Sequence, residues 1–173
     1  MSEQQNDNRL REGYERLLER MQGGANELTW ENLQKDLDDA VEFESELEEY
    51  TKDELALLRA WVERDLKDMR YFMADTGKQV ASWLGIDIDG LSRRVAESLL
   101  SIADRSVVER ERFEEDLEAA RADYCEGEMA APGLMACTHC DAQVMLPTVA
   151  RLEPCHQCGH RYFYRFPNKI IEI

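Results

Sequence analysis

The sequence predicts a mainly α-helical fold: an antiparallel helical bundle or coiled-coil hairpin followed by a small β zinc ribbon. Apolar residues recur at three- and four-residue steps through the first two thirds of the 173-residue chain. Two Cys-x-x-Cys pairs follow near its end, and every proline, histidine and cysteine lies after residue 124. We therefore expect an acidic helical domain over residues 1–124 and a C-terminal zinc-ribbon module over residues 125–173.

The first two helices are predicted from apolar spacing and from their end signals. The first is expected to stop at Gly23-Gly24, after a buried stripe of Leu10, Tyr14, Leu17, Leu18 and Met21. Thr29 can cap the second helix, whose inward side carries Trp30, Leu33, Leu37, Ala40, Val41 and Leu47. These stripes are the pattern of a packed helical core.

The third helix has the clearest start. Thr51 and Glu54 have the spacing of a capping box, and the stripe behind them comprises Leu55, Leu58, Val62, Leu66, Met69 and Met73. A fourth helix is expected from about Leu91 to Tyr124, with a short helix and a turn in the connection over residues 77–90. Because such stripes can pair within one chain or between two, a homo-oligomer through the helices stays open.

The negative charge is concentrated in the helical part. Residues 1–124 hold 17 Lys/Arg against 32 Asp/Glu, a net charge of −15, whereas residues 125–173 hold 4 against 5, a net charge of −1. The run from Glu31 to Glu54 is typical of a solvated helix face and also suits a basic partner. A chain this acidic has no general attraction for phosphate backbones or anionic membranes. We find neither a secretory signal nor an apolar run of about 18 residues, and we expect a cytoplasmic protein without membrane contact.

The strongest signal is the spacing of four cysteines, Cys137, Cys140, Cys155 and Cys158. Two Cys-x-x-Cys loops that face each other offer four thiolates to one tetrahedral ion, and the spacer between them suits the hairpin of a zinc ribbon. We predict that these four residues bind one structural Zn²⁺ per chain. Iron accepts the same four thiolates, and an iron site would indicate a rubredoxin-like electron carrier instead.

Other residues near the cysteines refine this prediction. Gly159 supplies left-handed backbone after the second pair, Asp141 takes the same place after the first, and residues 161–166 are expected to form a closing strand. We expect His139, His156 and His160 to lie beside the metal without binding it. The remaining thiol, Cys125, is interpreted as a free cysteine near the hinge, with a redox or spare-ligand role as the alternative.

The ribbon also carries the only basic and aromatic cluster of the sequence, formed by Arg151, Arg161, Tyr162, Phe163, Tyr164 and Arg165. Nucleic-acid-binding ribbons stack bases on such rings and bind phosphates with such arginines. Because the module is close to neutral and lies beside a strongly acidic domain, we interpret the rings mainly as packing residues and keep nucleic-acid binding as the alternative.

Several segments together resemble the YbeL-like family of bacterial zinc-ribbon-containing proteins. The resemblance covers nearly the whole chain and is carried by Tyr14-Glu15-Arg16-Leu17-Leu18, Asp53-Glu54-Leu55, Val62-Glu63-Arg64-Asp65-Leu66, Gly127-Glu128 and Pro154-Cys155-His156-Gln157-Cys158-Gly159-His160. It implies that the four cysteines named above are the metal ligands. Asp141 departs from the glycine that is more usual after the first pair. The family implies an architecture but no established activity.

No catalytic motif appears: the sequence has no Gly-rich phosphate loop, no Gly-x-Ser-x-Gly elbow and no His-Glu-x-x-His. We therefore expect a non-enzymatic adaptor or regulator that contacts an unidentified protein partner. The alternative is a transcription-linked factor that acts on RNA polymerase or nucleic acid. An acidic helical hairpin with a four-cysteine finger is similar in architecture to the DksA-type polymerase regulators, although Asp36-Leu37-Asp38-Asp39-Ala40-Val41 does not match their Asp-x-x-Asp-x-Ala tip.

Overall fold

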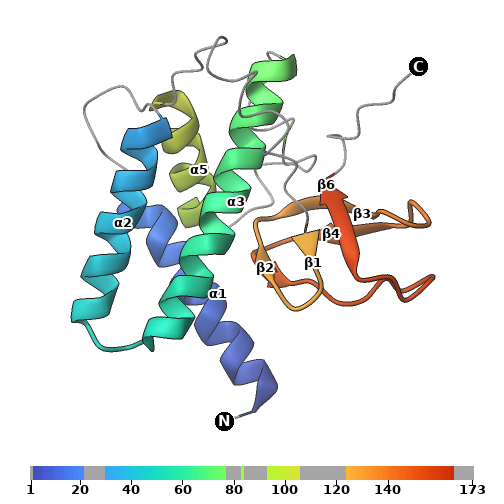
Figure 1. The fold of residues 1–173 in the computed structure, drawn as a ribbon, viewed down its shortest axis with the longest axis horizontal. Helices are drawn as coiled ribbons and strands as arrows, with labels where there is room; N and C mark the ends of the chain where they lie inside the picture. The colour runs from blue at the N-terminus through green and yellow to red at the C-terminus, as the bar shows by residue number, and fades with distance from the viewer. Residues whose placement is uncertain (1, 22–29, 77–82, 84–92, 106–123, 166–173) are drawn as a thin grey trace.

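The computed structural model describes residues 2–21, 30–76, 83, 93–105 and 124–165. It consists of four helices on one side and a small antiparallel strand region on the other, so the predicted fold class is confirmed (Figure 1). The helices are α1 (Glu3–Arg20), α2 (Trp30–Glu46), α3 (Lys52–Thr76) and α5 (Arg93–Arg105). None of the described helices has the length and apolar content that crossing a membrane requires.

The helix starts follow local hydrogen-bonding chemistry. At the start of α3 the N–H of Glu54 donates to Thr51 Oγ1 and the N–H of Thr51 donates to Glu54 Oε2, so the predicted capping box is confirmed. A second capping box starts α1, where Ser2 and Gln5 exchange the equivalent bonds. This second box was not predicted from the sequence. Both boxes satisfy amide groups that have no partner inside the helix.

The core between the helices contains most of the predicted apolar stripes. Helix α1 packs against α3 and α5, and α2 forms a hairpin with α3. The buried residues of the first three helices include Leu10, Tyr14, Leu17, Leu18, Met21, Leu33, Leu37, Ala40, Leu55, Leu58, Val62, Leu66 and Met69. Leu47 is an exception: it is 45% exposed because α2 ends at Glu46, before the residue can turn inward.

The prediction that the fourth helix extends to Tyr124 is wrong. Helix α5 is described as far as Arg105, and Tyr124 lies in strand β1 (Tyr124–Cys125) rather than in a helix. The physical reason is tertiary: the main chain of β1 pairs with Tyr162 and Phe163, and the Tyr124 ring is fully buried. The rest of that predicted span, residues 106–123, lies outside the described residues, as do the connection 77–90 apart from Trp83 and the predicted stop at Gly23-Gly24.

The strand region contains two antiparallel sheets. The larger has the order β1-β6-β3-β4, from β3 (Gly133–Cys137), β4 (Gln143–Leu146) and β6 (Tyr162–Arg165) together with β1. The smaller pairs β2 (Met129–Ala130) with β5 (Ala150–Arg151). The closing strand predicted over residues 161–166 is therefore present as β6, and Phe166 lies outside the described residues.

The strand region packs directly on α1 and α3 (Figure 1). Met129, Ala131 and Val149 belong to the same buried apolar cluster as the helical stripes, whereas a second cluster, including Met135, Leu146 and Phe163, lies inside the ribbon. The division after residue 124 stays a prediction, and the shared cluster makes the contact between its two parts extensive.

Candidate metal centre

Each Cys-x-x-Cys pair forms a tight loop closed by backbone hydrogen bonds. In the first loop, Cys137 ends β3, and its carbonyl accepts from the N–H of Asp141 at 3.0 Å. In the second, the carbonyl of Cys155 accepts from the N–H of Gly159 at 2.8 Å. Asp141 and Gly159 have φ values of +59° and +73°, so both predicted left-handed positions are confirmed. Asp141 accepts a hydrogen bond from the hydroxyl of Tyr164 at 2.8 Å, which fixes this side chain at the turn.

The two loops bring the four cysteine sulfurs together. All four Sγ atoms lie within 4.8 Å of one another, and the contacts Cys137–Cys158 and Cys140–Cys155 are both 3.6 Å. A tetrahedral zinc with Zn–S bonds of about 2.3 Å requires sulfurs about 3.8 Å apart. Four thiolates at this spacing fit one tetrahedral Zn²⁺.

The pKa values of Cys155 and Cys158 are shifted in opposite directions. Hydrogen bonds from the backbone N–H groups of Cys158 and Gln157 lower the pKa of Cys155 to about 6. The pKa of Cys158 is raised, because desolvation and the neighbouring thiols outweigh the N–H of His160, which lowers it. Cys155 therefore offers a thiolate at lower pH than Cys158, and metal binding displaces the proton that Cys158 carries.

The three histidines lie around the cysteines. The rings of His139 and His160 have centroids 5.4 Å apart, and His160 meets the edge of Tyr162 at 5.8 Å. His156 is exposed. In the described part of the chain, the four cysteines are the only group of three or more metal-binding side chains that comes together. Cys125 is half-buried in β1 and does not belong to that group.

The predicted basic and aromatic cluster does not form one surface. The Arg165 side chain is completely buried and faces the helices. Arg151 bonds Asp7 of α1 at 2.7 Å and the carbonyl of Gly127 at 2.5 Å. Only Arg161 is largely exposed, and it pairs with Glu126 at 2.8 Å. Because the pleat of β6 places alternate residues on opposite faces, Arg165 and Tyr162 cannot serve the same ligand.

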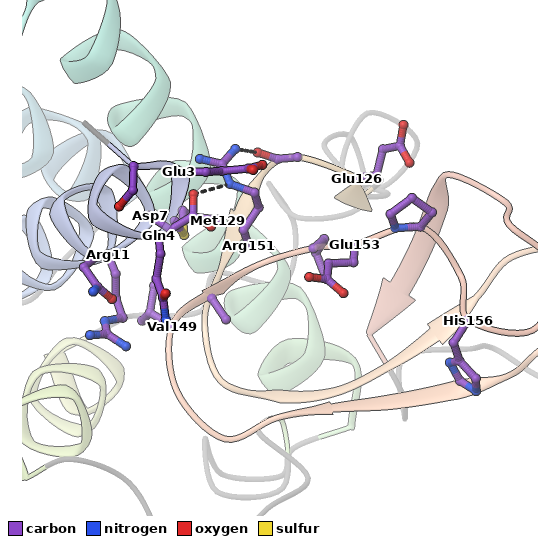
Figure 2. Close-up of a pocket in the computed structure, with 16 residues that line it drawn as sticks. Glu3, Gln4, Asp7, Arg11, Glu126, Met129, Val149, Arg151, Glu153 and His156 are labelled. Atoms are coloured by element: carbon purple, nitrogen blue, oxygen red, sulfur yellow. Dashed lines mark hydrogen bonds and ion pairs between the residues drawn. The ribbon is translucent and has the colours of Figure 1, made fainter.

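An open groove lies between α1 and the ribbon. The first turns of α1 form one wall, the segment from Val149 to Pro154 forms the other, and His156 lies at the rim (Figure 2). Asp7 and Arg151 point toward each other across it. Both acidic and basic side chains line the groove, and the Asp7–Arg151 ion pair joins its two walls.

A buried polar group that the sequence analysis missed lies where α3 meets the ribbon. We call it the interface cluster; its members are Tyr14, Arg64, Asp65, Asp68, Trp83, Tyr124 and Arg165. Asp65 accepts from the Tyr14 hydroxyl at 2.5 Å, and Asp68 accepts from Trp83 Nε1 at 2.9 Å. The signal available in the sequence was a pair of acidic residues three apart within an apolar stripe. Their partners are too distant in sequence to be identified from spacing.

A model of a protein family described as a zinc-ribbon containing domain matches residues 22–167, which include the helical part from α2 onward and the four cysteines. No curated protein and no solved structure matches the chain significantly. The expected membership of a zinc-ribbon family is confirmed at this level, and the narrower YbeL-like resemblance stays an expectation.

Proposed function

The chain belongs to the family of zinc-ribbon containing domains, and on that basis we propose that it is a non-enzymatic adaptor or regulator. In this proposal, Cys137, Cys140, Cys155 and Cys158 hold one structural Zn²⁺, and the acidic helices contact a protein partner. A reducing compartment such as the bacterial cytoplasm suits the site, because reduced thiols are available there for metal.

The observation that carries the proposal is the closed set of four sulfurs. A catalytic zinc keeps a coordination position for water or substrate, whereas four cysteines within 4.8 Å of one another fill all four positions of a tetrahedral ion. When bound, the metal would supply a cross-link between the two loops. In a ribbon of short strands such a cross-link contributes directly to folding.

The partner surface we favour is the outward side of α2. Asp39, Glu42 and Glu46 are exposed there. Phe43, 45% exposed, lies among them with one face of its ring against the Arg20 guanidinium at 3.7 Å, and Leu47, also 45% exposed, directly follows the helix. Exposed carboxylates attract a basic partner and accelerate its association, and apolar residues can be buried on contact. The combination favours a protein partner over nucleic acid, whose phosphates the carboxylates would repel.

The metal part is tested by metal analysis of untagged protein beside Cys155→Ser. The expected result is one zinc per chain in the parent and none in the variant. One iron per chain with visible red colour would support the electron-carrier alternative, because iron accepts the same four thiolates. Absence of metal from protein refolded with zinc would contradict the proposal.

The partner part is tested by crosslinking in cells followed by capture, with the parent chain, a Glu42→Lys/Glu46→Lys variant and a control, Glu97→Lys, on the exposed side of α5. The expected result is a partner crosslinked to the parent and the control but lost from the α2 variant, with binding that weakens steeply as salt increases. A partner that is retained by the α2 variant would place the interface elsewhere. Binding of purified RNA polymerase at low salt would support the transcription-linked alternative.

A further inference from the structure

The interface cluster joins the ribbon to the helices through one side chain above all, that of Arg165. Nη1 donates to the carbonyl of Pro132 at 2.8 Å, and Nη2 donates to the carbonyl of Ala131 at 3.2 Å. Nη2 also reaches Asp65 Oδ1 at 3.4 Å, and Nε lies 3.5 Å from Asp68 Oδ2. The guanidinium therefore binds the chain leading into β3 and two carboxylates of α3 at once.

The helical side of the cluster needs this cation. Asp65 and Asp68 are both almost completely buried, and the Arg165 guanidinium lies 4.1 Å from the centre of the Trp83 ring. Buried carboxylates that lose their counter-charge are costly, because the remaining charge has no water to solvate it. Departure of the ribbon would remove the Arg165 charge from two neighbouring buried acids of α3.

The position of Arg165 depends in turn on the cysteine loops. Cys137 ends β3 and lies opposite Phe163 of β6, and the N–H of Thr138 donates to the carbonyl of Tyr162 at 3.1 Å. Strand β6 starts three residues after Gly159, which closes the second loop, and Arg165 lies opposite Met135 within the same β3–β6 pairing. The two strands contain only five and four residues. Because the pairing is this short and each strand connects to a cysteine loop, a shift of either loop alters the register of the whole pair.

Other contacts across the boundary come from the segment that leads into β3 and from Arg151 of β5, which bonds Asp7 of α1 at 2.7 Å. The N–H of Ala131 donates to Asp65 Oδ2 at 3.0 Å, and Arg64 donates to the carbonyl of Met129 at 2.6 Å. Met129 and Ala131 are also part of the helical apolar core. Loosening of β3 and β6 would thus disturb hydrogen bonds, ion pairs and apolar contacts of α3 together.

We propose that metal occupancy of the four-cysteine site controls the docking of the ribbon on the helical bundle, with Arg165 as the residue that couples the two. The inference rests on the zinc binding of the proposed function. It adds that the metal controls the contact between the ribbon and the helices as well as the fold of the ribbon. Zinc holds β3 and β6 in register, the register holds Arg165 between Asp65 and Asp68, and loss of zinc undocks the ribbon and destabilises the helices. Coupling of this kind is reciprocal, so loss of the Arg165 contacts weakens zinc binding.

The test follows the thermal melting of the helices by circular dichroism at 222 nm in the full chain, with zinc and after chelation. The described helices lie before residue 106, and the described residues of the ribbon are strands and turns, so this signal reports the helical part. We expect zinc to raise the Tm of the parent by roughly 5–10 °C, and Cys155→Ser to match the chelated parent. A helical Tm that does not respond to zinc in protein that holds one zinc would overturn this inference and leave the proposed function intact.

The role of Arg165 is tested with Arg165→Met and a matched control, Arg161→Met, which removes an exposed arginine of the same strand region. Arg165→Met should abolish most of the zinc-dependent Tm shift and weaken zinc affinity by about tenfold, whereas Arg161→Met should keep both. Arg165→Lys, which keeps the charge but not the forked donors, should give an intermediate shift and serves if the methionine variant does not fold. A full zinc-dependent shift in either Arg165 variant would overturn the coupling role. Protein that takes up no metal at all would overturn both proposals.

Discussion

Arg165 of β6 and Asp65 of α3 lie 100 positions apart in the chain and form a fully buried ion pair, with Nη2 and Oδ1 3.4 Å apart. Burial acts to raise the pKa of Asp65, but the charges of Arg64 and Arg165 outweigh it and hold this pKa below its usual value. For Asp68 burial prevails over Arg165 and over the bond from Trp83, so the pKa is raised. The pKa values of two carboxyls that lie about one helical turn apart are thus shifted in opposite directions.

The first prediction compares neutral replacements of these two acids. Asp65→Asn should destabilise the zinc-loaded protein by about 3 kcal/mol at pH 7, because it removes the counter-charge of the buried Arg165 and one of the two acidic partners of the partly buried Arg64. Asp68→Asn should cost less, about 1–2 kcal/mol, because an amide oxygen can still accept from Trp83 while only the charge contact with Arg165 is lost. Urea unfolding at saturating zinc measures both. Equal losses in the two variants would contradict the assigned environments.

The second prediction concerns Glu54 at the start of α3. Its hydrogen bond from Arg9, at 2.5 Å, is the main cause that lowers its pKa. A lowered folded pKa contributes stability above the unfolded value of about 4.3, and this contribution is lost as the pH falls. Glu54→Gln can keep the capping box through its one amide oxygen, but its NH2 group replaces the oxygen that accepts from Arg9. It therefore removes the ion pair and should cost about 0.5 kcal/mol at pH 7.

The Glu54→Gln difference in unfolding free energy should narrow as the pH falls from about 5 through 4. Both proteins carry the same cysteine site, so any zinc release cancels in the comparison. A difference that stays constant down to pH 4 would show that the charge of Glu54 is not the source of the effect.

The third prediction distinguishes the four cysteine ligands from the three histidines near them. Serine at any one of the four clustered cysteines should remove most of the zinc, because three sulfurs leave the tetrahedral shell incomplete. Alanine at His139, His156 or His160 should leave one zinc per chain, since the histidines lie outside the four-sulfur group. Metal analysis after gel filtration measures this directly. Loss of zinc from a histidine variant would require a different ligand set.

The fourth prediction concerns Gly13 in the middle of α1. A Cβ atom there would lie 2.8 Å from Leu58 Cδ1 and 3.0 Å from Tyr50 Cζ. Alanine favours a helix over glycine by about 1 kcal/mol, but overpacking of a buried contact costs about 1–3 kcal/mol. We expect Gly13→Ala to be destabilising overall by about 1 kcal/mol in urea unfolding. The exposed neighbour Glu12→Ala serves as the control, and a stabilised Gly13→Ala would show that Leu58 and Tyr50 can move away.

The sequence alone determined the parts of this protein that depend on local spacing. The helical stripes, the capping box at Thr51 and Glu54, and the left-handed turns at Asp141 and Gly159 are set within a few residues, and each is present. The four cysteines belong to the same class, since two short loops with the right turn residues suffice to predict that the sulfurs meet.

Only the tertiary structure decided the roles of Tyr124, Asp65 and Arg165. Helical periodicity placed Tyr124 at the end of a helix, but its pairing with Phe163 made it a strand residue. By sequence Arg165 belonged to a basic and aromatic cluster interpreted mainly as packing residues, and the pleat of β6 turned it toward the carboxylates of α3. The physical reason is that the energy of a buried charge depends on which side chains surround it in space. For Arg165 those side chains come from parts of the chain that no local pattern connects.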